Sequence, residues 1–309
     1  RSNISFSFNR GFYSFKLIKD FMDESKKADY INIHFPIAEI FPLTFLTKKP
    51  ILLNYHCLPN GNSFFSKILF IYFYFFGFIS SLLSKKVIVF TKDYFYSFFI
   101  NKLIKKNLIE ILPFIRKNSI TSNYKNAKKE KIIKIGYLGR MSEEKGLEHL
   151  IEASKIMKVN KIKHSIYIAG DYEDKRFSKN INILFEKSQN NKNIHFLGKI
   201  SEKRKHNFYN SIDVLILPST NSFEAFGLVQ LEAMSYGKPV IASNMYGVRI
   251  PIQYTGNGLL FKKGNVNELV QCITSYYFNK KNTKKNIINN YKKYFNKNKF
   301  KKSYLSIFN

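Results

Sequence analysis

The sequence predicts an α/β protein with two parallel-sheet domains. Two series of strand and helix signals lie on either side of one polar, charge-dense stretch at residues 116–131. In the second series a strand, a helix and another strand follow closely between Asp213 and Ser243, the pattern of a right-handed crossover between parallel strands. With 309 residues, 45% of them hydrophobic, the chain is long enough to bury two cores of ordinary size.

The polar stretch sets the expected domain boundaries. It is charge-dense and contains few large apolar residues, which is typical of a linker. We expect an N-terminal domain over residues 1–117, a linker over 118–130 and a C-terminal domain over 131–290. The tail at 291–309 is rich in Lys and carries Tyr and Phe at helical intervals, which predicts a final helix with buried aromatic rings.

The first series begins with an irregular lead and a helix from about Tyr13 to Lys27. Two strands then end at Pro36 and His56, and each carries a His near its end. In a parallel sheet these carboxyl ends form the rim where ligands bind, and we interpret His34 as a structural residue of that rim. The remaining expected elements are a helix at residues 64–84, a strand at KKVIVFT, a helix at DYFYSFFINKLI and a strand at LIEILPF.

Residues 64–84 are apolar enough to raise the question of a membrane span. The uncharged run from Ile68 to Leu83 is 16 residues long, short of the roughly 20 that a spanning helix needs. Gly77 and Ser80 interrupt it. We therefore expect a helix packed on the first sheet, with one aromatic face available for shallow contact with lipid.

The second series opens with a strand from Ile132 to Leu138, a loop that carries Gly139, Arg140 and Lys145, and a helix from about Gly146. Two cations in a strand-to-helix loop can hold a diphosphate, Arg through its planar fork and Lys as a point charge. Ordinary solvated loop charges are the alternative. Two further strands are expected at HSIYIAG and NIHFLG.

The most informative stretch is EAFGLVQLEAMSYGKPVIAS, which follows a buried strand from Val214 to Leu217. A helix is expected from near Phe226 to Gly237, because Gly can close a helix in the left-handed conformation and Pro just beyond cannot continue it. The run Val240-Ile241 then suits a second buried strand.

Two carboxylates flank this helix start, Glu224 just before it and Glu232 inside it. Acids that fold over one pocket can accept hydrogen bonds from hydroxyl groups. The amides of Phe226, Gly227 and Leu228 lie between them at a helix N-terminus, which favours an anionic group such as a phosphate. The alternative is a loop acid and a solvated helix position without a joint function.

The same stretch resembles the signature of family 4 nucleotide-sugar glycosyltransferases, retaining enzymes whose two Glu are separated by seven residues. The resemblance covers most of the chain and implies the GT-B fold, two Rossmann-like domains facing a cleft, with the last helix packed back on the first domain. Ala225 stands where many members have Gly, and VRIP follows Gly247 where many have an acid. No strand with a Gly-rich turn precedes Asp29, so we expect an N-terminally incomplete first domain.

The resemblance also implies roles for individual residues. Glu224 contacts the transferred sugar, Glu232 the ribose hydroxyls, and His56, in a segment similar to the YHC element of one branch, reaches over the sugar. Arg140 and Lys145 hold the donor phosphates, and the strand end at Gly198 contacts the base. The expected donor-binding residues are Gly139, Arg140, Lys145, Gly198, Lys199, Ile200, Glu224, Phe226, Gly227, Leu228 and Glu232, and the expected catalytic residues are Glu224, His56, Arg140 and Lys145.

The formal net charge of +30 requires an explanation. Seven of the 51 basic residues are Arg and the other 44 are Lys, scattered among Asn, Ile, Phe and Tyr as AT-rich coding DNA would produce. Readers of base sequence use Arg forks, and none cluster here, so we expect no nucleic acid partner. An electrostatic preference for anionic membrane surfaces remains, at about 1 kcal/mol per Lys near the surface.

Cysteine and metal-ligand patterns limit the chemistry further. Cys57 and Cys272 fit no metal or redox spacing, which indicates a reducing compartment, and we expect a cytoplasmic, peripherally membrane-associated protein. There is no Asp-x-Asp triplet and the six His are not at ligand spacing, so no divalent metal or other cofactor is expected.

The leading hypothesis is a retaining hexosyltransferase-type enzyme that moves a sugar from a nucleotide-diphosphate-sugar donor to an acceptor hydroxyl. The acceptor would be a glycan or lipid-linked glycan in cell-surface glycan or glycolipid biosynthesis. One alternative is a nucleotide-sugar epimerase of the same architecture, which needs acid/base groups from the first domain. Others are a basic nucleic-acid-binding protein, with steeply salt-dependent affinity, and a non-catalytic relative.

Overall fold

A computed structural model describes residues 6–8, 11–61, 63–115, 132–171, 179–183, 186, 192–278 and 283–308. The chain divides into two compact units, Arg1–Leu112 with Ser303–Asn309, and Pro113–Lys302. The expected linker at 118–130 lies outside the described residues. The predicted α/β class with two parallel sheets is confirmed, and each unit is described by itself below.

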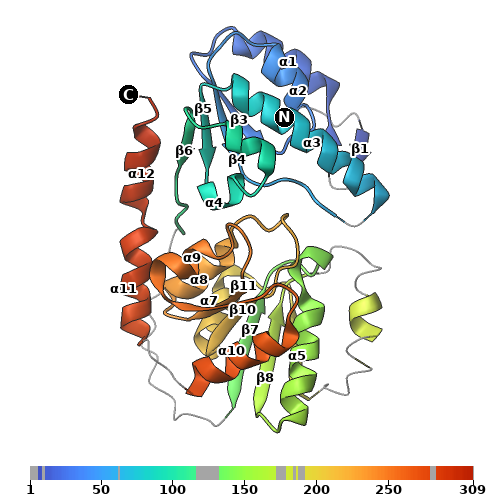
Figure 1. Cartoon of the computed structure of the whole chain (residues 1–309), viewed down its shortest axis with the longest axis vertical. Helices are drawn as coiled ribbons and strands as arrows, with labels where there is room; N and C mark the ends of the chain where they lie inside the picture. Colours follow the sequence, from blue (N-terminus) through green and yellow to red (C-terminus); the bar gives the residue numbers. More distant parts are fainter. Residues whose placement is uncertain are drawn as a thin grey trace. The chain divides into compact units, whose positions relative to one another are not determined.

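The first unit is built on a four-stranded parallel sheet with the order β3-β4-β5-β6 (Figure 1). Its four strands follow apolar segments that the sequence predicts as strands, and β4 is buried along its whole length. The elements are α1 (Phe15–Ser25), β3 (Ile31–Phe35), α2 (Ile40–Phe45), β4 (Ile51–Tyr55), α3 (Phe64–Leu83), β5 (Lys86–Val89), α4 (Lys92–Phe95), a 3-10 helix (Phe99–Leu103) and β6 (Leu108–Glu110).

Helix α3 packs on this sheet through one face, as the sequence predicts. Phe73, Gly77, Ser80 and Ser81 are its buried residues. A Cβ atom at Gly77 would lie 2.8 Å from the ring of the fully buried Phe35, so only Gly lets the helix approach β3 this closely. The opposite face is exposed, and the helix is long and apolar enough to cross a membrane by length and composition alone.

Two sequence predictions in the first unit are wrong. The lead, expected to be irregular, contains a short antiparallel pair, β1 (Phe6–Phe8) with β2 (Gly11–Tyr13). The helix expected over DYFYSFFINKLI breaks into α4 and the 3-10 helix. The Ser97 hydroxyl donates to the Tyr94 carbonyl at 2.6 Å and the Asn101 amide to the Phe95 carbonyl at 3.1 Å, so side chains occupy acceptors that a continuous helix would use.

The second unit is built on six parallel strands with the order β12-β11-β10-β7-β8-β9. Its core is a cluster of apolar residues from the strands, α5 and α10, and these two helices lie side by side against the sheet (Figure 1). The elements are β7 (Ile133–Leu138), a 3-10 helix η2 (Glu143–Lys145), α5 (Leu147–Val159), β8 (His164–Ala169), β9 (Ile194–Gly198), α7 (Glu202–Ser211), β10 (Val214–Leu217), α8 (Leu228–Ser235), β11 (Val240–Ser243), α9 (Ile250–Thr255), β12 (Gly258–Phe261), α10 (Val266–Phe278), α11 (Lys284–Tyr294) and α12 (Lys297–Leu305).

Helix α8 begins at Leu228 instead of near Phe226. Gly227 takes a left-handed conformation with φ of 76° at the N-cap, so the helical geometry starts one residue after it. The tail expected to form one helix over 291–309 falls into α11 and α12. Helix α11 packs on α8 and α9, whereas Ser303–Asn309 group with the first unit.

The second sheet depends on a close backbone approach at Gly258, where we expect Gly258→Ala to destabilise the fold. A Cβ atom there would lie 1.8 Å from the Val240 carbonyl oxygen of the paired strand, and backbone cannot yield as a side chain can. We expect a loss of about 3 kcal/mol, measured by urea unfolding. Gly139→Ala is the control, since its nearest neighbour, the Tyr137 hydroxyl, would lie 3.7 Å from the new methyl group. Equal unfolding midpoints for the two variants would contradict the prediction.

Candidate functional site

The candidate site lies at the carboxyl ends of two adjacent strands in the second sheet. Strand β7 leads into the loop with Gly139 and Arg140, and β10 leads into the loop with Glu224. The Thr220 amide donates to the Glu144 carbonyl at 2.9 Å and the Thr220 hydroxyl to the Glu143 carbonyl at 3.2 Å. Segments far apart in the sequence therefore form one surface at this edge of the sheet.

Two glycines permit close packing of the loops that follow β7, β8 and β10. Gly146 has φ of 63°, and a Cβ atom there would lie 2.0 Å from the Pro218 carbonyl oxygen. Gly170, at the end of β8, would place a Cβ atom 1.8 Å from the Gly139 carbonyl oxygen. Any larger residue at either position would push the loops apart.

Lys145 and Glu224, which the sequence assigns to different parts of one ligand, form an ion pair with each other. Their side chains are 18% and 10% exposed, and the Ser219 hydroxyl lies 3.5 Å from the same Glu224 oxygen. Partly buried charges are costly unless they are paired, so the two side chains hold each other in place.

Arg140 is more exposed than Lys145. Its guanidinium lies 3.9 Å from the Glu144 carboxylate, and its side chain is 54% exposed. The Tyr137 hydroxyl donates to the Arg140 carbonyl at 2.8 Å. Burial, with a contribution from the Glu224 charge, raises the pKa of Tyr137 well above its ordinary value, so the phenol keeps its proton and the backbone at Arg140 stays fixed.

The N-terminus of α8 is held by a residue that sequence analysis missed. The Gln230 amide donates to the carbonyl oxygens of Phe226 and Val248, both at 2.9 Å, and so joins the helix start to the loop before α9. The sequence signal was a single Gln between Val229 and Leu231 in an otherwise apolar stretch, and the structure buries its side chain fully. Leu228 is 42% exposed, so the start of α8 is open to solvent on one side.

Glu232 is positioned by two residues of α7. The Tyr209 hydroxyl donates to one carboxylate oxygen at 2.8 Å, and the Lys205 ammonium lies 3.6 Å from the other. The Tyr209 ring stacks on Tyr236 with centroids 4.9 Å apart. Sequence analysis missed Lys205 and Tyr209, although their spacing of four places them on one face of a helix.

The expected base-binding segment lies at the same edge of the sheet, farther from β10. Strand β9 ends at Gly198, which has φ of 61° and whose carbonyl accepts from the Gly170 amide at 2.9 Å. Lys199 is exposed and Ile200 is half-buried. No described side-chain contact joins this segment to Glu224 or Glu232.

His56 belongs to the first unit, at the end of β4. Its Nε2 lies 2.8 Å from Nδ1 of His34, the residue that we interpreted as merely structural. Burial, and then the neighbouring His34, lowers the pKa of His56 from its ordinary value. Both strands carry Asn-x-His near their carboxyl ends, NIH at residues 32–34 and NYH at 54–56, and this repeat is the sequence signal for the pair.

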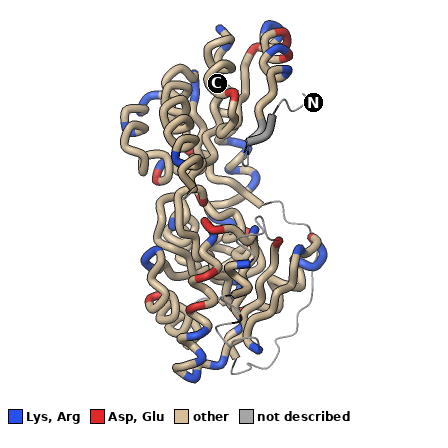
Figure 2. The backbone as a smooth tube through the Cα atoms, turned by 90° about the vertical axis from the view of Figure 1, so that its right-hand side faces the viewer, with Lys and Arg blue, Asp and Glu red and all other residues tan. Residues whose placement is uncertain are grey.

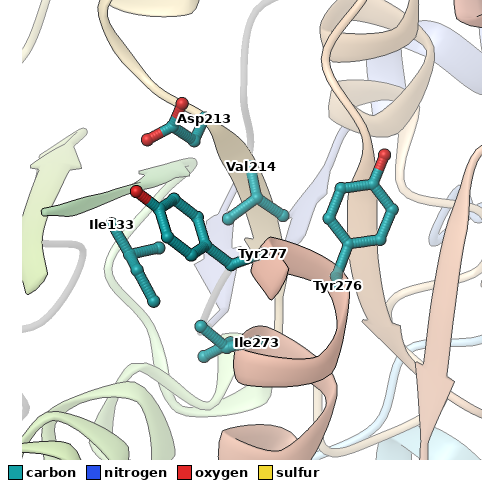
Figure 3. Close-up of a pocket in the computed structure, with 6 residues that line it drawn as sticks. All are labelled: Ile133, Asp213, Val214, Ile273, Tyr276 and Tyr277. Carbon is teal, nitrogen blue, oxygen red and sulfur yellow. The ribbon is translucent and has the colours of Figure 1, made fainter. Parts of the chain in front are cut away.

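A small pocket lies elsewhere on the second unit and belongs to none of these residues. It is lined by Ile133, Asp213, Val214, Ile273, Tyr276 and Tyr277 (Figure 3). Ile133 and Val214 begin their strands, so the pocket is at the amino ends of β7 and β10, opposite the candidate site.

Comparison with known proteins identifies relatives across most of the chain. A Klebsiella pneumoniae protein named "Uncharacterized 41.2 kDa protein in cps region" is 28% identical over 300 residues, which cover 90% of this chain and 76% of that protein. The Staphylococcus aureus capsular polysaccharide biosynthesis glycosyltransferase CapM is 27% identical over 184 residues, 56% of this chain and 47% of CapM.

Solved structures match the fold. Anabaena Alr3699/HepE in complex with UDP and glucose superposes with a TM-score of 0.75 at 16% identity, covering 94% of this chain and 81% of that one. TarM superposes with a TM-score of 0.73 at 18% identity, covering 97% of this chain and 60% of TarM. The profile of the family described as "Glycosyl transferases group 1" matches residues 119–294, more than half of the chain. The chain therefore belongs to the glycosyl transferases group 1 family, and its two parallel-sheet units have the GT-B fold.

Proposed function

We propose that this chain transfers a sugar from a nucleotide-diphosphate-sugar donor to an acceptor hydroxyl, with retention of the anomeric configuration, as in family 4. The main support for this proposal is the contact between the loops at the carboxyl ends of β7 and β10. It brings Arg140, Lys145 and Glu224 together on one surface. This set offers cations for a diphosphate and a carboxylate for sugar hydroxyls.

The Lys145–Glu224 ion pair suggests how donor binding is achieved. A diphosphate that reaches Lys145 replaces the carboxylate as its partner, and Glu224 is then available to hydroxyl groups of the sugar. A ligand with both a phosphate and a sugar satisfies both side chains, whereas a nucleoside diphosphate satisfies Lys145 alone. The site is therefore suited to a complete donor.

During transfer the departing diphosphate gains negative charge. Arg140, Lys145 and the amides at Phe226, Gly227 and Leu228 stabilise it without a metal ion, so we propose a metal-independent enzyme. With retention, the acceptor attacks from the face that the phosphate leaves, and a phosphate oxygen helps to remove the acceptor proton. Glu224 and His56 orient the sugar, and the Glu224 carboxylate supports positive charge on its ring.

The remainder of the donor is assigned to two other segments. Glu232, oriented by Tyr209 and Lys205, accepts hydrogen bonds from the ribose hydroxyls. Residues 198–200 at the end of β9 contact the base. UDP is a suitable probe, because Alr3699/HepE was crystallised with UDP and with UDP-glucose.

Relatives suggest the biological setting. They include CapM and a Staphylococcus aureus poly(ribitol-phosphate) alpha-N-acetylglucosaminyltransferase. We propose a glycan or lipid-linked acceptor in cell-surface polysaccharide biosynthesis, at the cytoplasmic side of the membrane.

An apolar surface on the first unit supports peripheral membrane binding. Along α3 the side chains at intervals of three, four and seven residues are 46% to 80% exposed: Phe64, Ile68, Ile71, Phe75 and Leu82. The ring centroids of Phe41 in α2 and Phe76 in α3 lie 4.5 Å apart, so Phe41 extends this surface. Lys and Arg are spread over both units (Figure 2), and their charge attracts anionic headgroups.

We expect the double variant Arg140→Ala/Lys145→Ala to bind UDP at least about a hundredfold more weakly, because each cation contributes a charge-assisted hydrogen bond of about 1.5 to 3 kcal/mol. Calorimetric titration measures this. The matched control replaces Lys155 and Lys163, two exposed cations of the same unit, and keeps parental affinity. EDTA leaves binding and turnover unchanged. Strict dependence on manganese or magnesium, with normal UDP binding by the double variant, would overturn the assignment.

Glu224→Gln and Glu232→Gln are expected to act on different parts of the donor. Glu232→Gln weakens hydrogen bonds to the ribose, so UDP affinity falls about tenfold. Glu224→Gln frees Lys145 from its partner, so UDP affinity stays the same or rises while turnover with the complete donor falls. Titration with UDP and steady-state kinetics separate the two effects. Parental binding and turnover in both variants would make the pair purely structural.

Membrane binding is expected to depend on the exposed face of α3. The variant Ile71→Ser/Phe75→Ser loses most of its binding to phosphatidylglycerol vesicles in flotation, and high salt releases the parent protein. Phe278→Ser is the control, since Phe278 is 73% exposed on the second unit. Salt-resistant binding by the parent would instead indicate that α3 inserts, and unchanged flotation of the double variant would exclude this surface.

A further inference from the structure

Four polar side chains form a continuous chain on one face of the first sheet. The Asn54 amide donates to the Asn32 carbonyl oxygen at 2.5 Å, and the Asn32 amide nitrogen lies 3.4 Å from Nε2 of His34. Nδ1 of His34 lies 2.8 Å from Nε2 of His56. His34 pairs with Asn54 in the sheet register, so the four side chains project from the same face of β3 and β4.

The two rings meet edge to edge, in the geometry of a hydrogen bond. Their planes differ by 17°, and their centroids lie 5.1 Å apart although the nearest nitrogens are only 2.8 Å apart. Rings stacked face to face would not place two nitrogens so much closer than the centroids. The backbone supports this arrangement, because the His56 amide donates to the Phe35 carbonyl at 3.0 Å.

The chain of bonds has a direction. The Asn32 carbonyl oxygen already accepts from Asn54, so Asn32 presents its NH₂ group, a donor only, to Nε2 of His34. That nitrogen must then accept, which leaves the proton of neutral His34 on Nδ1. Nδ1–H of His34 donates to Nε2 of His56, so neutral His56 must carry its own proton on Nδ1.

We propose that Asn54, Asn32 and His34 are positioning residues that hold His56 as the neutral Nδ1–H tautomer, so that its Nδ1–H is the donor offered to the sugar. This rests on the proposed contact of His56 with the donor sugar. Protonation of His56 would set two N–H donors against each other at the ring-to-ring bond, so the chain also keeps His56 neutral. The lowered pKa of His56, caused first by burial and then by His34, agrees.

The decisive variant is Asn32→Asp, which keeps the shape of the side chain but presents only acceptors. His34 must then donate from Nε2, its Nδ1 becomes an acceptor, and His56 must carry its proton on Nε2. Both tautomers reverse. The measurement is a two-dimensional nitrogen–proton spectrum of the full chain with ¹⁵N-labelled His. It is recorded at about pH 9, because a carboxylate raises the pKa of a neighbouring His and the tautomers are compared between neutral rings.

The protein contains its own control for this measurement. Nδ1 of His164 lies 2.8 Å from the Ile162 carbonyl, which only accepts, and its Nε2 lies 2.7 Å from the Ser154 hydroxyl. His164 is therefore also an Nδ1–H tautomer, and its signals must not move in Asn32→Asp. An Nε2–H signal for His56 in the parent, or no reversal in Asn32→Asp, overturns the proposal.

Kinetics separate this proposal from the proposed function. With the wrong tautomer at His56, Asn32→Asp lowers turnover at least about tenfold while UDP affinity stays within about twofold, because the proposed diphosphate contacts come from the second unit. His56→Gln lowers turnover as well. If the tautomer reverses while both variants turn over like the parent, the bond chain exists but its catalytic role is overturned.

A second variant covers the case in which Asn32→Asp does not fold. His34→Phe keeps a ring at this position and removes the donor to His56 Nε2. The His56 signals are then expected to shift toward the Nε2–H tautomer that a free histidine side chain prefers, with a similar loss of turnover. Unchanged His56 signals in this variant overturn the proposal.

Discussion

The contact between the loops after β7 and β10 is the constraint on which the candidate site depends. It joins Lys145 to Glu224, which are 79 positions apart in sequence, because their strands are neighbours in the sheet. The contact is possible only because Gly146 has no side chain where the Pro218 carbonyl approaches. A methyl group at this single position would move Lys145 away from Glu224. It would thereby separate the group proposed to bind phosphate from the group proposed to bind the sugar.

The ion pair also explains how the protein tolerates these two partly buried charges. Each side chain is at most 18% exposed, so an unpaired ammonium or carboxylate would lose most of its hydration. Pairing compensates this cost, and the Lys145 ammonium keeps further N–H donors while the second Glu224 oxygen can still accept. A molecule that combines an anion for Lys145 with hydroxyl groups for Glu224 can bond to both side chains, whereas one that carries the anion alone bonds to Lys145 only.

The sequence predicted most of the fold because its strands are short apolar runs bounded by Gly, Pro and polar residues. Nine of the ten strands that the described residues form in the two parallel sheets were found this way, all except β12. The segment at residues 92–103 was mispredicted because apolar periodicity does not reveal that Ser97 and Asn101 bond to backbone carbonyls. Local competition of this kind decides helix length, and it is visible only once the side chains are placed.

The candidate site was predicted residue by residue but not as a set of contacts. Glu224, Glu232, Lys145 and His56 were identified from motifs, yet their partners were not, because sequence spacing gives no information on strand order. Tyr209 and Lys205 reach Glu232 from α7, a helix that carried no recognised motif. Which side chains meet across a sheet or between helices depends on tertiary packing. Local sequence patterns give no information on it.

The two units supply different kinds of groups, and the difference suits the proposed chemistry. The second unit carries Arg140 and Lys145, the cations that we propose stabilise a diphosphate as it gains negative charge. The first contributes His56, which burial and His34 keep neutral. A protonated ring would repel positive charge that develops on the sugar, whereas a neutral N–H can still bind a sugar hydroxyl. The Asn-x-His repeat on β3 and β4 is thus best understood as a device that provides a hydrogen-bond donor without providing a charge.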